Sequence, residues 1–168
     1  MHFTRNAFRA VFLGGFLVCA GLIAFALYAQ YRLGMNPCPL CILQRVAFIA
    51  LGLVFLVGGL WAPRGSARKL LALLVTLIAL VGIAIAMRHL WIQSLPPGTI
   101  SSCGAPLGYL LETRHAHGGL WGVLRMVLSG SGECAQVEYV LGLPIPLWSL
   151  AWFVLLGAAG GLTGWRSR

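Results

Sequence analysis

The sequence predicts an all-α membrane protein, a four-transmembrane-helix bundle with one long outer loop that carries a short interfacial helix. Of its 168 residues, 60% are hydrophobic and 9% are charged, whereas soluble proteins average about 25% charged residues. The apolar residues are gathered into four runs, each near the roughly 17–25 residues that cross a hydrocarbon core as a helix. A soluble fold of this length has too little interior to bury so much apolar surface.

The four runs define a single membrane domain, residues 1–168. Its expected spans are about 10–31, 41–62, 70–89 and 145–164. The first run exceeds the roughly 7–15 apolar residues of a cleaved signal peptide, so we expect it to remain as a helix. The second run is long enough only when its helix starts near the Cys-Pro-Leu-Cys stretch.

The basic residues are distributed unevenly over the two sides of this bundle. Seven of the twelve lie in the two tails and the connection at 63–69: Arg5, Arg9, Arg64, Arg68, Lys69, Arg166 and Arg168. Short basic segments remain in the cytoplasm, so both termini are expected there, with the loops at about 32–40 and 90–144 outside. The net charge of +9 follows from this topology. Because the basic residues are dispersed and belong to no known nucleic-acid-binding motif, no nucleic-acid partner is expected.

Most of the cysteines lie on the outer side. Four of the five are there: Cys38, Cys41, Cys103 and Cys134. Disulfides persist in oxidising compartments outside the cytoplasm, so these four are candidates for redox chemistry. Cys19 lies in the middle of the first span, where a free cysteine behaves as a small hydrophobic residue.

The stretch NPCPLCILQR, residues 36–45, has the parts of a redox dithiol. Its asparagine suits a helix cap and its two prolines suit a first helical turn. Cys38 and Cys41 are then placed where the positive end of the helix dipole stabilises a thiolate. Arg45 follows Cys41 by one turn on the same face, where a guanidinium favours the Cys41 thiolate further.

Other interpretations of this stretch remain open. A structural disulfide that closes so short a loop adds little stability. A metal site built from both cysteine pairs needs four neighbouring thiolates, but Cys103 and Cys134 are 31 positions apart, so no metal is expected. Arg45 by itself is also compatible with a side chain that only reaches for the headgroups.

A redox dithiol also needs an electron acceptor that reaches the edge of the bilayer. The sequence has no Gly-x-Gly-x-x-Gly, no Cys-x-x-Cys-His haem attachment and no iron–sulfur spacing. A lipid-soluble quinone reaches such a site. Arg45 is placed to hydrogen-bond a quinone carbonyl and the negative charge that develops on its oxygen.

The second outer loop holds Cys103 and Cys134 with an amphipathic segment between them. The apolar residues of this segment share one helical face, with Arg125 on another: Leu120, Trp121, Leu124, Val127 and Leu128. We favour a helix in the membrane interface over an ordinary packing helix. One dithiol lies at the membrane and the other in the loop. We therefore favour a relay of electrons by thiolate exchange over a loop disulfide that is only structural.

These features together resemble the DsbB family, the bacterial inner-membrane quinone-dependent disulfide oxidases that re-oxidise DsbA. The resemblance covers nearly the whole chain. It rests on the four spans, on Cys-x-x-Cys-x-x-x-Arg as Cys38, Cys41 and Arg45, on the two loop cysteines, and on the run GEC…LGLPIPLW before the last helix. The stretch RHAHGG makes the outer loop longer than the family pattern.

The resemblance implies a role for each outer cysteine. Cys103 would form the mixed disulfide with a DsbA-like periplasmic thioredoxin-fold oxidase, and Cys134 would be its partner in the loop. Cys41 would be the quinone-facing cysteine of the membrane pair. Cys38 would be the exchange partner of Cys41.

The resemblance also implies the cofactor and the location. Ubiquinone or menaquinone would bind beside Cys41 and Arg45, with His89 matching a histidine near the quinone. The chain would be a multi-pass protein of the bacterial inner membrane, with cytoplasmic termini and periplasmic redox cysteines. Two alternatives remain: a vitamin K epoxide reductase-like quinone reductase with a similar cysteine relay, and a non-enzymatic membrane subunit with disulfide-stapled outer loops.

Overall fold

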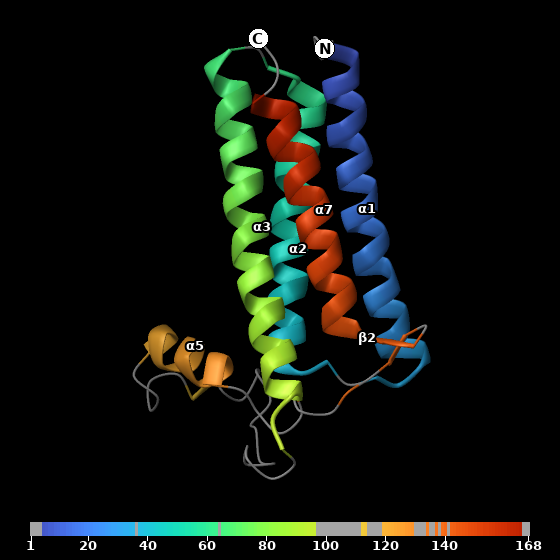
Figure 1. The fold of residues 1–168 in the computed structure, drawn as a ribbon, viewed down its shortest axis with the longest axis vertical. Coiled ribbons are helices and arrows are strands. Elements are labelled where there is room, and N and C mark those ends of the chain that lie inside the picture. The colour runs from blue at the N-terminus through green and yellow to red at the C-terminus, as the bar shows by residue number, and fades with distance from the viewer. Residues whose placement is uncertain are drawn as a thin grey trace.

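Four long helices form the frame of the protein. The computed structural model describes residues 5–35, 37–63, 65–96, 112–113, 119–129, 134, 137, 139–140 and 142–165. The long helices are α1 (Arg5–Arg32), α2 (Pro39–Trp61), α3 (Ser66–Gln93) and α7 (Ile145–Trp165). They stand side by side, and the beginning of α1 and the end of α7 lie at the same end of the bundle (Figure 1). Each is long and apolar enough to cross a membrane, which confirms the predicted all-α, four-helix fold.

Two of these helices are longer than the apolar runs that predict them. α1 begins at Arg5 rather than near residue 10. α3 begins at Ser66 rather than near residue 70 and ends at Gln93 rather than near residue 89. The added turns bring basic side chains into contact with neighbouring helices: Arg9 donates to the backbone carbonyl of Gly59 at 3.2 Å, and the buried Arg68 guanidinium lies 4.1 Å from the centroid of the Phe8 ring.

The first turn of α2 is fixed by a cysteine and a proline. Cys38 is the N-cap, with extended backbone angles (φ −66°, ψ 161°), and its sulfur accepts a hydrogen bond from the Cys41 backbone N–H at 3.4 Å. Pro39 follows as the first helical residue, where its missing N–H removes no helical hydrogen bond. The cap is therefore one of the two motif cysteines, and not the asparagine two residues before it that the sequence suggests.

The helices pack closely where small residues face aromatic rings. Phe153 of α7 stacks on Phe48 of α2, with ring centroids 3.9 Å apart. A Cβ atom at Gly82 of α3 would lie 2.5 Å from the Phe153 ring, so only glycine allows α3 to approach so closely. In a bilayer, where lipid tails are as apolar as side chains, this close packing is a main source of helix association.

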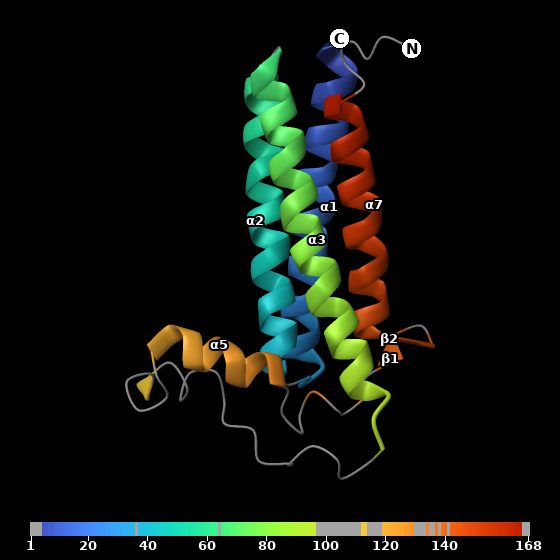
Figure 2. The same ribbon diagram turned by 60° about the vertical axis from the view of Figure 1, so that its left-hand side comes forward.

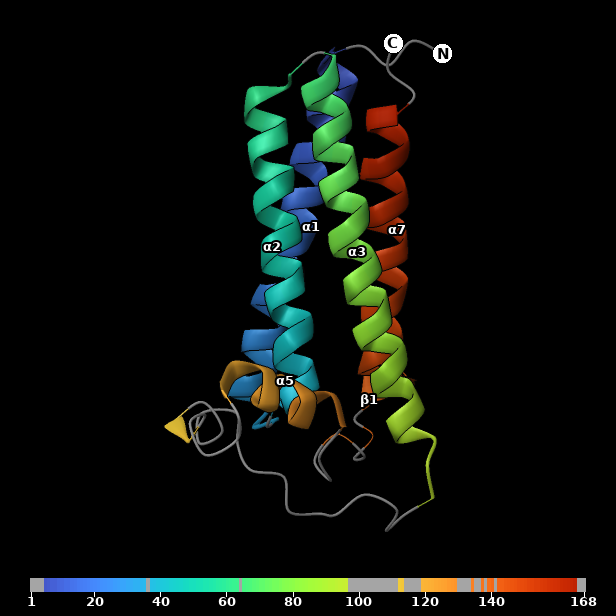
Figure 3. The same cartoon turned by 90° about the vertical axis from the view of Figure 1, so that its left-hand side faces the viewer.

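The end of the bundle opposite the start of α1, called the outer end below, carries the other helix and the strands of the described residues (Figure 1). α5 (Gly119–Ser129) runs across the long helices and contacts α2 (Figures 2 and 3). β1 (Tyr139–Val140) and β2 (Leu143–Pro144) form a short antiparallel hairpin immediately before α7. The short helix predicted in the second outer loop is therefore present.

One end of α5 is exposed, and a residue further along is buried. Leu120 is 67% exposed and Trp121 is 77% exposed, whereas Val127 is 4% exposed. Val127 belongs to a small apolar cluster at the outer end together with Cys38, Leu40, Ile92 and Cys134. Part of the predicted apolar face therefore packs against the protein and part of it is exposed. The side chains of Arg125 and Leu128 lie outside the described part of the chain.

Candidate active site

The site begins with two sulfurs in contact at the start of α2. The S–H of Cys38 lies 3.4 Å from the Cys41 sulfur, and both residues are free thiols. A disulfide has an S–S length of about 2.05 Å, so closing this pair requires only a small movement within one helical turn. Cys38 is buried, whereas Cys41 is partly exposed.

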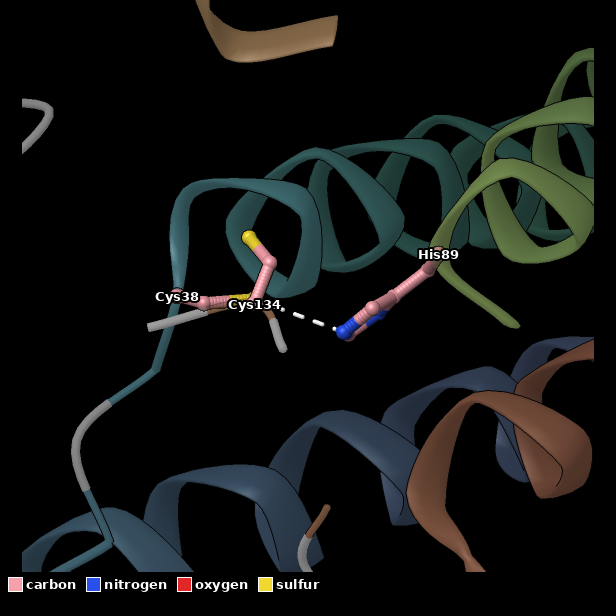
Figure 4. Close-up of side chains that lie close together, drawn as sticks. All are labelled: Cys38, His89 and Cys134. Carbon is pink, nitrogen blue, oxygen red and sulfur yellow. Dashed lines mark hydrogen bonds between the residues drawn. The ribbon is translucent and has the colours of Figure 1, made fainter. Parts of the chain in front are cut away.

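A third sulfur comes from Cys134, which lies between α5 and β1 in the sequence. Cys134 is fully buried, and its sulfur, the Cys38 sulfur and a ring nitrogen of His89 all lie within 4.8 Å of one another (Figure 4). The predicted loop cysteine and the predicted membrane pair are therefore brought together. Cys103, the other loop cysteine, lies outside the described residues.

His89 is held against Cys38 near the end of α3. Its Nε2 atom lies 3.7 Å from the Cys38 sulfur, and its Nδ1 atom lies 3.3 Å from the side-chain amide nitrogen of Gln44. Gln93, one turn further along α3, places its amide nitrogen 3.5 Å from Nε2. His89 and Gln44 are 2% and 3% exposed, and buried polar groups of this kind need hydrogen-bond partners. The ring is fixed from both of its nitrogens.

Arg45 is directed to α1. Its Nη2 atom donates to the backbone carbonyl of Ala26 at 3.1 Å, and its Nη1 atom donates to the side-chain oxygen of Gln30. The sequence places Arg45 on the Cys41 face of α2, and the structure adds the partners that hold the guanidinium there. An arginine near the bilayer edge is stable only with such partners.

A cavity of about 320 Å³ opens beside Cys41, between α1, α2 and α7. Its polar lining residues are Cys41, Gln44 and Arg45 of α2 and Ser149 of α7, and most of the remaining wall is apolar and aromatic. Ligand sites are commonly about 300–1,000 Å³ and mainly apolar, with a few placed polar groups. Cys41 and Arg45 therefore share one binding space.

The two cysteines of the first pair face different surroundings. Cys41 is on the wall of the cavity, whereas Cys38 contacts His89 and is close to Cys134. Among the described residues that line the cavity, His89 is absent. The predicted place of His89 beside a quinone stays a prediction, and its observed contact is with the other side of the pair.

Sequence reasoning missed three glutamines that contact the side chains of this site, Gln30, Gln44 and Gln93. Gln30 receives the Arg45 guanidinium, and Gln44 contacts the His89 ring. A signal was present, because a glutamine in an otherwise apolar helix is a polar group that needs a partner. The identity of that partner depends on how α1, α2 and α3 pack.

The comparisons with known proteins agree on one family. The family model described as "Disulfide bond formation protein DsbB" matches residues 8–163. A Disulfide bond formation protein B of Xanthomonas euvesicatoria pv. vesicatoria is 48% identical over 166 residues, which cover 98% of this chain and 94% of the relative. A protein of the same name from Xylella fastidiosa is 46% identical over 170 residues, covering 100% of this chain and 96% of the relative.

The closeness of Cys38 and Cys134 predicts a specific crosslink. In the double variant Cys41→Ser/Cys103→Ser, mild oxidation with diamide should join Cys38 to Cys134, with the two electrons passing to diamide. After denaturation, a maleimide–polyethylene glycol reagent should then label only Cys19. The matched control adds Cys134→Ser and should leave both Cys19 and Cys38 open to labelling. Persistent labelling of Cys38 in the double variant would show that the two sulfurs do not meet.

Proposed function

The chain belongs to the DsbB family of disulfide bond formation proteins, and from that premise we propose that it is a membrane thiol:quinone oxidoreductase. Its substrate is the reduced form of a DsbA-like periplasmic thioredoxin-fold oxidase, and its electron acceptor is the membrane quinone pool. The observation that carries this proposal is the division of the Cys38–Cys41 pair. One sulfur lies near the loop cysteine, and the other lines an apolar cavity.

The first half of the reaction takes place among the cysteines. The partner's dithiol attacks the Cys103–Cys134 disulfide at Cys103, leaves oxidised, and transfers two electrons to the loop pair as thiols. The Cys134 thiolate then attacks the Cys38 sulfur of the Cys38–Cys41 disulfide and displaces Cys41. Cys103 in turn attacks Cys134 in this mixed disulfide, which restores the Cys103–Cys134 disulfide and releases Cys38 as a thiol. Each step is thiolate attack through a mixed disulfide. The closeness of the Cys134 and Cys38 sulfurs supports this choice of attacked sulfur.

The released Cys41 thiolate then lies on the wall of the cavity. The cavity fits a quinone because its walls are mainly apolar and aromatic and because Arg45 supplies donors beside Cys41. A quinone held there, ubiquinone or menaquinone, would supply a two-electron sink: it would take two electrons and two protons as the Cys38 and Cys41 thiols rejoin in a disulfide. Arg45, fixed by Ala26 and Gln30, places positive charge at the point where negative charge develops.

His89 is placed to serve the exchange step. Its Nε2 atom lies 3.7 Å from the Cys38 sulfur, which is within reach of a proton that arrives at or leaves that sulfur. We propose that His89 handles this proton. A role beside the quinone, which the resemblance implies, would pass through Gln44, which contacts the His89 ring and also lines the cavity.

The family match bears on the two alternatives. A non-enzymatic subunit with stapled loops needs neither a cavity beside Cys41 nor a loop cysteine next to Cys38. A vitamin K epoxide reductase-like enzyme shares the cysteine relay, but the family model that matches residues 8–163 is that of the disulfide bond formation proteins. The oxidase is therefore the function we propose.

We place the protein in the bacterial inner membrane with both termini in the cytoplasm and the four redox cysteines in the periplasm. The excess of basic residues in the tails and in the 63–69 connection supports this orientation. A cysteine introduced at Ser101 or Ser131 should react with a membrane-impermeant maleimide in intact spheroplasts, whereas one at Ser66 should not. The opposite labelling pattern would invert the topology and remove the periplasmic partner.

The contacts of Arg45 predict the effect of its removal. Arg45→Met should raise the KM for quinone about tenfold, corresponding to the loss of about 1.4 kcal/mol of binding, because the cavity loses its charged donor. Arg45→Lys should restore part of the affinity, since an ammonium lacks the planar fork that reaches both α1 acceptors. Arg32→Met is the matched control, because it removes an exposed basic residue from the outer end of α1. An unchanged KM in Arg45→Met would exclude Arg45 from the quinone site.

The proposed relay predicts that the two cysteine pairs fail in different ways. Cys103→Ser/Cys134→Ser should not oxidise a DsbA-like partner efficiently, yet quinone should regenerate its Cys38–Cys41 disulfide after chemical reduction. Cys38→Ser/Cys41→Ser should oxidise at most one equivalent of partner, because the electrons have no path out of the loop pair. Both variants are tested by comparing the oxidation of the partner in a single turnover with its oxidation over many turnovers. Repeated turnover by the second variant would mean that the loop cysteines reach the quinone directly.

A further inference from the structure

Three potential metal ligands converge at the outer end of the bundle. The sulfurs of Cys38 and Cys134 and a ring nitrogen of His89 lie within 4.8 Å of one another (Figure 4). They come from the start of α2, from the loop before β1 and from near the end of α3. All three residues are buried, with exposed fractions of 4%, 0% and 2%. The relay uses these sulfurs for disulfide exchange, but the same three groups are also suitable metal ligands.

The separations are those of a tetrahedral metal site. With Zn–S of about 2.3 Å and Zn–N of about 2.0–2.1 Å, tetrahedral angles place a sulfur and a nitrogen about 3.6 Å apart and two sulfurs about 3.8 Å apart. The Cys38 sulfur lies 3.7 Å from His89 Nε2 and 3.4 Å from the Cys41 sulfur. The Cys38–His89 edge of the proposed site therefore matches a tetrahedral metal to within a few tenths of an ångström, the Cys134 sulfur lies within 4.8 Å of both, and Cys41 is close enough to Cys38 to take the fourth position.

We propose that the fully reduced protein binds one thiophilic d¹⁰ cation of the zinc class through Cys38, Cys134 and His89. The fourth position is open to the Cys41 sulfur or to water. Two thiolates and a neutral imidazole around a divalent cation give a site with no net charge. A buried site of this kind avoids the large desolvation penalty of an unpaired charge.

Gln44 completes the surroundings of the proposed site. A histidine that ligates through Nε2 carries its proton on Nδ1 and commonly donates it to a second residue, which fixes the orientation of the ring. The Gln44 side-chain amide lies 3.3 Å from Nδ1, and a 180° rotation of that amide brings its oxygen to the same position. The ring is thus already held with Nε2 toward Cys38.

The proposed site exists in only one redox state of the protein. Each sulfur ligand is consumed when a disulfide forms, so oxidation removes the site and a bound cation withholds the sulfurs from exchange. Cys103 is not one of the proposed ligands. The wide spacing between Cys103 and Cys134 argues against a site made of four thiolates, but it does not bear on this site. The binding itself rests on geometry alone and does not depend on the relay.

Cadmium is a suitable probe, because its thiolate complexes absorb in the ultraviolet. The full chain in detergent, reduced with a phosphine and desalted without oxygen, should bind one equivalent of Cd²⁺ with a charge-transfer band. The diamide-oxidised protein should show no such band. X-ray absorption of the Zn²⁺ form of the wild type should show sulfur ligands at about 2.3 Å and a nitrogen ligand at about 2.0–2.1 Å. This measurement needs no variant, so it decides the question even when substitutions disturb folding.

Substitutions identify the ligands. Cys134→Ser and His89→Ala should each weaken Cd²⁺ binding by more than about 100-fold, since even the loss of an outer-shell partner weakens a metal site about 10–100-fold. Cys19→Ala is a matched control, because Cys19 is a buried cysteine of the bundle outside this cluster. It should leave the affinity unchanged. Cys103→Ser should also keep the affinity while abolishing turnover in the relay, so the metal site and the oxidase function fail separately.

Three results would overturn the proposal. The first is the absence of stoichiometric binding to the reduced wild type. The second is an affinity that stays unchanged in Cys134→Ser, which would assign the ion to the Cys38–Cys41 pair alone. The third is a zinc spectrum with sulfur ligands and no nitrogen ligand, which would remove His89 from the site.

Discussion

The first turn of α2 is the constraint on which the rest of the site depends. Cys38 is the N-cap and Pro39 is the first helical residue, so the helix begins between the two cysteines of the motif. An N-cap residue has extended backbone angles, and its side chain turns back toward the helical N–H groups. Cys41, one turn later, already projects from the helix surface. This difference in backbone directs one sulfur toward α3 and the loop, and the other toward the cavity.

Two kinds of contact hold the helices together. The larger core cluster is apolar and rich in aromatic rings, including Phe8, Phe12 and Phe55. The outer end instead contains contacts between polar side chains, His89 with Gln44 and Arg45 with Gln30. Polar groups in an apolar surrounding are stable only when they are paired. The packing of α1, α2 and α3 therefore supplies a partner for each of these polar groups.

The sequence was sufficient for features that depend on local patterns. Four apolar runs predict four helices, and prolines near Cys38 and Cys41 predict a helix start at that point. The amphipathic segment before Cys134 predicts α5. The partners of Arg45 and the burial of Cys134 beside His89 were not predictable in this way, because they join segments far apart in the chain. Their positions depend on the angles and depths at which helices pack, which a residue pattern does not encode.

The burial of Cys38 has a consequence for electron leakage. A small water-soluble thiol reduces a disulfide only when it approaches a sulfur directly in line with the S–S bond, and Cys38 is 4% exposed. The partly exposed sulfur, Cys41, lies on the wall of a mainly apolar cavity, which charged thiols such as glutathione enter poorly. In the proposed relay, a Cys38–Cys41 disulfide is therefore shielded on both sides from the thiols of the surrounding water.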